Sequence, residues 1–325
     1  MKLFSCVCQQ LLFFESVTCT RCGRALAFLP DRMQVAAHDP AQYRLCRNYT
    51  EQGVCNWAIP AGDPDEYCRS CRLDKVIPNL ANAGAKEGWH RLESAKRRLL
   101  YTLIDLGLPV EGLAFQFLED APGGNKVFTG HEGGVITINV AEADDPFREK
   151  MRVQMGEAYR TLLGHFRHEV GHHYWERLVS RSDRLEAFRE RFGDERADYD
   201  QARQRHYEQG PPADWGTRFV SVYASMHPWE DWAETWAHYL HMTDTLETAR
   251  AHGVVVRAEG AAVRTRRLDL SDFEDLVAGW FPLTMALNSL NRSMGLPDLY
   301  PFVLSETAVA KLRFVHEVIA AARPD

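Results

Sequence analysis

Cysteine is missing from most of this chain. All 8 cysteines of the 325 residues lie between Cys6 and Cys71, and none follows. Chemistry that needs thiols is therefore confined to the amino-terminal part of the sequence. This contrast in composition predicts two domains, a cysteine-rich module at residues 1–75 and a larger domain at residues 76–325.

Long apolar runs and an excess of positive charge are also lacking. No apolar stretch approaches the roughly 18 to 20 residues that a membrane-spanning helix needs, so we expect no membrane partner. The 38 Lys and Arg against 45 Asp and Glu leave a net charge of -7, which gives no general affinity for nucleic acid. With 45% hydrophobic residues, the chain is able to bury a sizeable core.

The first residues lack the features of a secretion signal. The stretch from Met1 to Phe14 has a single lysine, and Gln9 and Gln10 interrupt its apolar part. Leu3 to Cys6 imitates a lipoprotein cleavage site, but that site would precede any adequate hydrophobic segment. We therefore expect no cleaved leader and a cytoplasmic protein, in which reduced thiols favour metal binding over disulfides.

The cysteines that are present come as close pairs. Two four-cysteine zinc sites follow, because zinc prefers a tetrahedron of thiolates and two turns can each deliver one pair. Proximity groups the first four and the last four, although spacing alone leaves an interleaved arrangement open. A disulfide framework is the alternative that a reducing compartment opposes. The predicted ligands are Cys6, Cys8, Cys19 and Cys22 in one site, and Cys46, Cys55, Cys68 and Cys71 in the other.

The charge of this module gives little support for nucleic-acid binding. Up to Lys75 the sequence has nine Lys or Arg and eight Asp or Glu. Each zinc with four thiolates adds about two negative charges. Protein recognition or support of the following domain is the better interpretation, although a neutral total leaves a local basic patch open.

The segment after the module predicts a connector, a helix and two strands. Residues 76–90 contain Pro, Asn and Gly and are interpreted as a loop and connector. Apolar residues recur at three- and four-residue spacing from Leu92 to Leu106, which predicts a helix. Strands are predicted at residues 113–118 and 135–140. The second of these could be a sheet edge that receives an extended peptide, or an ordinary half-buried strand.

The most specific motif lies in a helical stretch that opens at Asp145 and runs towards Arg177. His168 and His172 are four residues apart, so both imidazoles project from one helix face and can hold one zinc ion. Zinc lowers the pKa of a bound water, and Glu169 can accept that proton and later pass it to a leaving amine. This is the H-E-x-x-H arrangement of metallopeptidases. The alternative is a set of charged residues on a solvated helix.

A zinc held by three protein ligands needs one further residue. The strongest candidates are Glu230 and Glu234, which are four residues apart in a second predicted helix and share a face. Trp229, Trp232 and Trp236 give that helix an apolar surface able to pack against the first helix. The alternative is a surface helix with two solvated glutamates.

With these blocks, the sequence resembles the gluzincin class of zinc peptidases, and most closely the zinc-binding metallopeptidases with an amino-terminal zinc ribbon. The block from Glu230 to Glu234 is similar to the E-F-F-A-E block of anthrax-toxin lethal factor. The resemblance implies that Glu230 is the third ligand, that Glu234 orients one histidine and that Tyr223 stabilises the oxyanion. Reversed roles for the two glutamates and a packing role for Tyr223 stay open. Asp231 and Trp232 replace two phenylalanines, so substrate specificity does not transfer.

The remaining polar residues carry weaker signals. His165 could reach the same helix face as His168, whereas His173 points about 100° away from His172 and is interpreted as structural. The Arg-rich stretch at residues 177–205 alternates with acidic residues and is typical of a solvated helical face.

Together these observations predict an α+β protein with a mostly helical, zincin-like catalytic domain and a small sheet, preceded by a zinc-ribbon module. We expect one catalytic and two structural Zn²⁺ ions and a protein or peptide substrate. Two other functions compete: a non-catalytic, zinc-stabilised adaptor, and a ribbon-directed protease that acts on nucleic-acid-bound proteins.

Overall fold

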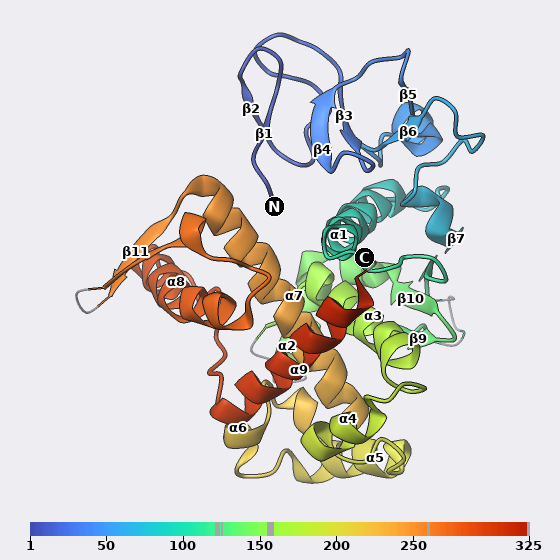
Figure 1. Cartoon of the computed structure of the whole chain (residues 1–325). Helices are drawn as coiled ribbons and strands as arrows, with labels where there is room; N and C mark the ends of the chain where they lie inside the picture. The colour runs from blue at the N-terminus through green and yellow to red at the C-terminus, as the bar shows by residue number, and fades with distance from the viewer. Residues whose placement is uncertain (121–123, 125, 155–158, 259–260, 324–325) are drawn as a thin grey trace. The chain divides into compact units, whose positions relative to one another are not determined.

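The computed structural model describes residues 1–120, 124, 126–154, 159–258 and 261–323 (Figure 1). Helices and short strands both occur, and the predicted α+β class is confirmed. The chain forms two compact units, Met1–Lys150 and Met151–Asp325. The domain boundary near residue 75 stays a prediction. Within the described ranges, no helix combines the length and the apolar character needed to cross a bilayer.

The cysteine-rich part of the first unit consists of short antiparallel strand pairs. The cysteines lie outside these strands, in the connecting segments and at the start of a 3₁₀ turn (Cys71–Leu73), and the small core contains Ala27, Leu29, Tyr43 and Ala58. Strands this short bury little apolar surface, so the module depends on other sources of stability. The pairs are β1 (Phe4–Ser5) with β2 (Leu11–Leu12), β3 (Leu26–Leu29) with β4 (Gln34–Ala37), and β5 (Tyr43–Leu45) with β6 (Ala58–Pro60).

Helix α1 (Ala85–Asp105) follows and packs on the cysteine-rich part. The Tyr101 ring lies 5.5 Å from Phe14 and 6.0 Å from Phe28, measured between ring centroids. The helix begins at Ala85, so the connector predicted for residues 76–90 is wrong in its second half. The reason is the burial of Trp89, which is 1% exposed. This burial favours a helix that begins before Trp89 rather than after it.

A four-stranded sheet completes the first unit, in the order β7 (Asp74–Val76), β8 (Ala114–Leu118), β10 (Val135–Asn139), β9 (Gly130–Glu132). Both predicted strands are present. The interpretation of the second one as a sheet edge is wrong, because β10 pairs with β8 on one side and with β9 on the other. Its alternation comes from Ile136 and Ile138, which are buried on one face of a central strand.

The second unit is helical, and its centre is the contact between α3 (Leu162–Leu178) and α7 (Pro228–His252). The helical stretch predicted from Asp145 is two helices, α2 (Asp145–Gln154) and α3. Thr161 starts α3, because its side chain accepts a hydrogen bond from the backbone N–H of Gly164. The other elements are α4 (Leu185–Phe192), α5 (Tyr199–Gln209), α6 (Trp215–Arg218), β11 (Val255–Ala258), β12 (Ala261–Arg264), α8 (Phe273–Ser293) and α9 (Glu306–Ala322).

A glycine inside the histidine motif sets the distance between α3 and α7. A Cβ atom on Gly171 would lie only 3.1 Å from the Cα of Ala233, so a side chain at this position would push the helices apart. The Trp232 indole N–H donates to the Gly171 carbonyl at 2.8 Å. Tyr174 stacks on Trp236 with 4.9 Å between ring centroids. These contacts hold the face of α3 that carries the histidines against the start of α7.

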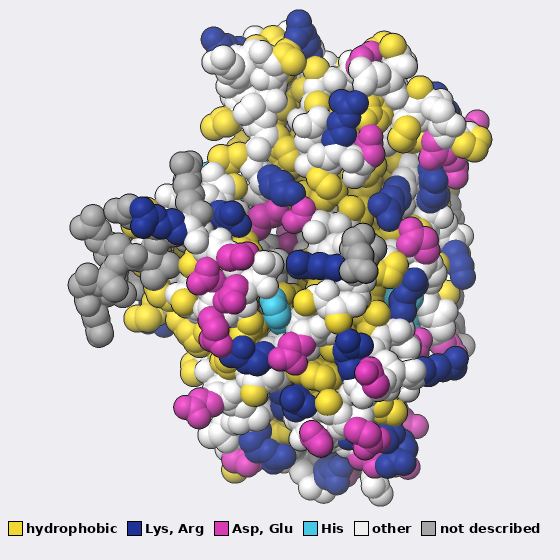
Figure 2. All heavy atoms as spheres, viewed as in Figure 1, with side chains coloured by type: hydrophobic (Ala, Val, Ile, Leu, Met, Phe, Trp, Pro, Cys, Tyr) yellow, Lys and Arg dark blue, Asp and Glu magenta, His cyan; other side chains and the backbone are white. Residues whose placement is uncertain are grey.

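Residues 177–205 form a charged surface. Arg189 pairs with Glu186 and Glu195, and Arg203 pairs with Asp200. Figure 2 shows basic and acidic side chains interspersed over the end of the second unit that carries α4 and α5. Most of this stretch is the solvated face that its sequence indicates.

Candidate metal centres and active site

Three side chains from α3 and α7 converge in the second unit. The Nε2 atom of His168 lies 3.0 Å, and the Nε2 atom of His172 lies 3.6 Å, from the Oε2 atom of Glu230. One donor atom from each residue falls within 4.8 Å of the other two. A tetrahedral zinc with bonds of about 2.0 to 2.1 Å would separate its ligand atoms by about 3.3 Å. The spacing of these three donors therefore fits a zinc ion.

The hydrogen bonds around His168 also fit a cation between the donors. Its Nδ1 atom lies 2.7 Å from the Oε1 atom of Glu234, and a proton shared there leaves Nε2 with a free electron pair. That pair faces Glu230 Oε2, which is buried and has no hydrogen bond of good geometry among the described residues. Electron pairs that meet in a buried place require a positive charge between them. Two imidazoles and a carboxylate are a ligand set typical of zinc.

Glu234 lies behind the histidine rather than among the donors. Its Oε2 atom accepts a hydrogen bond from the Ser221 hydroxyl at 2.6 Å. Burial opposes ionisation of Glu234, but the hydrogen bond from His168 outweighs it and lowers the pKa of this carboxyl. Glu230 thus lies with the two Nε2 atoms, whereas Glu234 lies at the Nδ1 atom of His168. The ligand role of Glu230 and the orienting role of Glu234 stay predictions.

Glu169 and Tyr223 lie next to this group. Glu169 is 8% exposed on α3, and burial raises the pKa of its carboxyl above the usual value. Tyr223 lies in a short 3₁₀ turn (Tyr223–Ser225), with its ring centroid 5.9 Å from that of His168. Burial raises the pKa of the Tyr223 phenol, so it stays protonated and able to donate a hydrogen bond.

The structure adds two aromatic residues that the sequence analysis did not place at the site. The Tyr199 phenol donates to Glu230 Oε1 at 2.8 Å. The Trp229 ring lies against the His172 imidazole, with 3.9 Å between centroids. Trp229 belongs to the block that was singled out for packing, whereas Tyr199 opens a helix within the charged stretch. The local sequence does not single out Tyr199, because the same polar helix also contains Tyr207.

Other histidines lie outside the group of donor atoms. His165 is on α3 but is not part of it, within the residues that the structure describes. Burial lowers the pKa of His173 to about 4, so this imidazole is neutral near pH 7. Burial likewise lowers the pKa of His238 to about 4, and its Nδ1 atom lies 2.7 Å from the Tyr300 hydroxyl.

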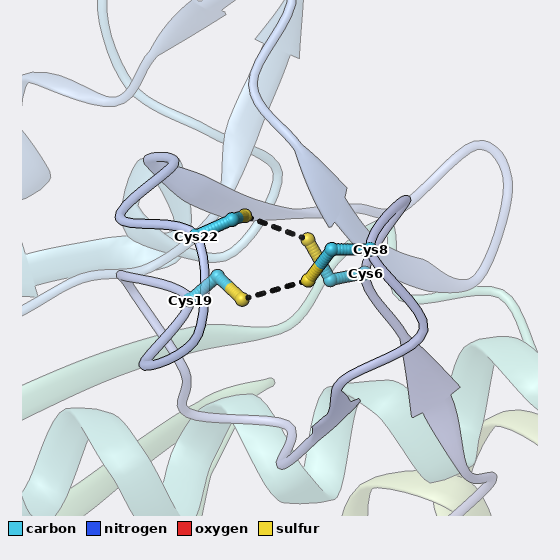
Figure 3. Close-up of side chains that lie close together, drawn as sticks. All are labelled: Cys6, Cys8, Cys19 and Cys22. Atoms are coloured by element: carbon cyan, nitrogen blue, oxygen red, sulfur yellow. Dashed lines mark hydrogen bonds between the residues drawn. The ribbon is translucent and has the colours of Figure 1, made fainter.

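The eight cysteines form two groups in the first unit. Figure 3 shows the sulfur atoms of Cys6 and Cys8 facing those of Cys19 and Cys22. The Sγ atoms are 3.6 Å apart in the pairs Cys6–Cys22 and Cys8–Cys19. Zinc–sulfur bonds of about 2.3 Å would separate tetrahedral ligands by about 3.8 Å. The spacing therefore fits a zinc site.

The last four cysteines form the second group, in which the Sγ atoms of Cys55 and Cys68 are 3.7 Å apart. All eight cysteines are free thiols in this structure. Each group consists of four cysteines that follow one another in the sequence, and the interleaved arrangement does not occur.

Comparisons with known proteins agree with both kinds of site. Residues 85–318 match the family described as "Putative zinc-binding metallo-peptidase", and residues 3–82 match a zinc-ribbon domain family. The chain belongs to this family of zinc-binding metallopeptidases. Relatives 46% identical to it, described as uncharacterized proteins of Mycobacterium tuberculosis and Mycobacterium bovis, align with 100% of this chain and 97% of their own length. No solved structure matches the chain.

Membership of this family confirms the resemblance to zinc-binding metallopeptidases with an amino-terminal zinc ribbon. It supports zinc binding and a peptidase at the level of the family. The number of zinc ions and the roles of individual residues stay predictions.

Proposed function

We propose that this chain is a cytoplasmic, gluzincin-like zinc peptidase that hydrolyses peptide bonds in a protein or peptide substrate. The observation that carries the proposal is the convergence of His168 Nε2, His172 Nε2 and Glu230 Oε2. Buried Glu169 adjoins them in the sequence and on the helix. One zinc would be held there, and two structural zincs would be held by the cysteine groups.

Each residue of the site has a task in this reaction. Bound zinc would act as a Lewis acid that polarises the scissile carbonyl and acidifies water. Glu169 takes the proton of the attacking water and returns it to the leaving amine, which its raised pKa favours. Tyr223 donates a hydrogen bond to the oxygen of the carbonyl as negative charge develops there. Glu234 keeps His168 oriented through its Nδ1 atom.

The ligand set favours an enzyme over a metal-stabilised adaptor. The group contains three protein donors, and no fourth joins it within the described ranges. Structural zinc sites close their coordination with four protein ligands, the number that each cysteine group offers, whereas catalytic sites use three. A three-donor set leaves one position at the metal for a reactant.

The test compares Glu169→Gln with Glu176→Gln, an exposed glutamate in the same helix. Each variant is incubated with a peptide library prepared from a whole proteome, since a narrow substrate range would escape any single test protein. Cleavage sites are read by mass spectrometry, and zinc content by elemental analysis. We expect Glu169→Gln to keep its zinc and lose cleavage by about 10²-fold or more, whereas Glu176→Gln behaves as the wild type. Cleavage that survives in Glu169→Gln at full zinc content would refute the assigned role.

A further inference from the structure

The two oxygen atoms of the Glu230 carboxylate face different groups. Its Oε2 atom faces the Nε2 atoms of His168 and His172. Its Oε1 atom accepts a hydrogen bond of 2.8 Å from the Tyr199 phenol. A carboxylate can bind a metal through one oxygen or through both. A donor on Oε1 therefore favours binding through Oε2 alone.

Tyr199 is itself held in place. It is the first residue of α5, where the Asp198 side chain caps the helix by accepting from the backbone N–H of Gln201. The Tyr199 ring lies 5.3 Å from the His227 ring and 6.2 Å from the Trp229 ring, between centroids. Trp229 in turn packs on His172. The Tyr199 ring is thus held by its neighbours, and this fixes the position of its hydroxyl group against Glu230.

The phenol also has the right protonation state for this contact. A tyrosine hydroxyl loses its proton only at about pH 10 in water. The hydroxyl remains a hydrogen-bond donor throughout the neutral range.

We propose that Tyr199 is a positioning residue that fixes Glu230 as a one-oxygen zinc ligand and so keeps room at the metal for the substrate. Loss of the phenol frees Oε1 to turn towards the metal, which changes both the affinity for zinc and the number of ligand atoms. The inference rests on the proposed function only in that the site holds metal. Its test therefore uses metal binding rather than peptide cleavage.

The experiment compares Tyr199→Phe with Tyr207→Phe in the full-length chain. Phenylalanine keeps the ring of residue 199 and its packing, so the fold is expected to survive. Tyr207 belongs to the same helix and is 59% exposed, which makes it a matched control. The zinc affinity of the histidine–glutamate site is measured by chelator competition. The zinc bound by His168→Ala, which retains only the cysteine sites, is subtracted. We expect about 10- to 100-fold weaker zinc binding in Tyr199→Phe and no change in Tyr207→Phe.

Two further measurements separate positioning from a general structural role. The visible spectrum of the cobalt-substituted site reports the number of ligand atoms, and we expect it to change in Tyr199→Phe and to stay constant in Tyr207→Phe. In a Glu230→Ala background, Tyr199→Phe should cause no additional loss of affinity, because the group that it positions is gone. Wild-type affinity and spectrum in Tyr199→Phe, or an equal loss in the Glu230→Ala background, would overturn the inference.

These outcomes also separate this inference from the proposed peptidase function. If the chain cleaves no peptide but Tyr199→Phe weakens zinc as expected, the positioning role stands and the peptidase proposal fails. If Glu169 is required for cleavage but Tyr199→Phe binds zinc normally, the peptidase proposal stands and the positioning role fails.

Discussion

The two cysteine groups of the first unit share one chemistry but differ in their surroundings. The outer cluster, Cys6, Cys8, Cys19 and Cys22, includes an exposed cysteine, Cys22, and a half-buried one, Cys8. The inner cluster, Cys46, Cys55, Cys68 and Cys71, is buried at every position. Water can stabilise the charge of the outer thiolates, whereas the charge of the inner thiolates has to be balanced by the protein.

Helix α1 supplies cations to the inner cluster. Arg97 donates to the backbone carbonyl of Val54 at 2.6 Å and to Glu93 at 3.3 Å. Lys96 donates to Glu93 at 2.7 Å and also pairs with Asp74. Burial disfavours the charge of Arg97, but the charges of Cys55 and Glu93 outweigh it and raise the pKa of the guanidinium. The cluster and the cations therefore stabilise one another.

This network also excludes one apparent metal site. Cys71, Asp74 and Glu93 offer donor atoms close enough to hold an ion. The Lys96 amine, however, is bonded to both carboxylates and already supplies the positive charge. Four thiolates can therefore stabilise a few exposed turns, as in the outer cluster, or form the charged centre of a whole unit, as in the inner cluster. The buried cations of helix α1 account for this difference.

Substitution of one cysteine in each cluster should distinguish the inner cluster from the outer one most clearly. Cys68→Ser removes a ligand that is 0% exposed, and we expect loss of the inner zinc together with cooperative unfolding of α1 and the sheet. Zinc binding by small domains contributes on the order of 10 kcal/mol to folding, so few other contacts can replace it. Cys22→Ser should lose the outer zinc and unfold only the turns near it. Hydrogen exchange of the α1 amides and zinc content per chain measure both effects.

Equal protection of the α1 amides in the two variants would mean that the inner cluster contributes no more to the stability of the first unit than the outer one. The wild-type chain loaded with zinc is the reference for both proteins.

Local patterns in the sequence predict the donors of the site because those donors depend on short spacings. Four-residue spacing puts His168 and His172 on one helix face, and the same spacing relates Glu230 and Glu234 on α7. Paired cysteines predict the zinc-ribbon module for the same reason. The approach of α3 and α7 depends on Gly171, a residue within the motif whose role becomes visible only when Ala233 is placed against it.

Features that depend on contacts between distant segments could not be predicted in this way. Tyr199 reaches Glu230 from another helix, and nothing near it in the sequence marks this contact. Lys96 and Arg97 occupy polar positions of a helical pattern, yet both are buried, because the charges that they face come from cysteines and acidic residues elsewhere in the unit. The alternation in β10 indicates a strand with one buried face, but it does not say how many neighbours that strand has.

An intermediate effect is expected when the cations of α1 are removed. Arg97→Met leaves Glu93 and the inner thiolates without one of their buried partners, which costs about 3 to 5 kcal/mol of unfolding free energy. Arg98 is the next residue, has a side chain that is 44% exposed and pairs with Glu15, so Arg98→Met should cost at most about 1 kcal/mol. The free energy of unfolding of the two variants is compared in urea, with hydrogen exchange of the first unit as the readout. Equal destabilisation would show that the inner cluster needs no special counter-charge.

The smallest expected effect concerns the rate at which the intact protein releases zinc. A chelator reaches the outer cluster through exposed Cys22, whereas the inner cluster has to open first because all of its sulfurs are buried. We expect two phases of release from the cysteine sites, with the outer zinc leaving at least about tenfold faster, a difference of about 1.4 kcal/mol in the barrier. Cys22→Ser should lack the fast phase and keep the slow one, and Arg97→Met should accelerate the slow phase alone. A fast phase that survives in Cys22→Ser would belong to the inner cluster and would show that burial of its sulfurs does not slow the release of zinc.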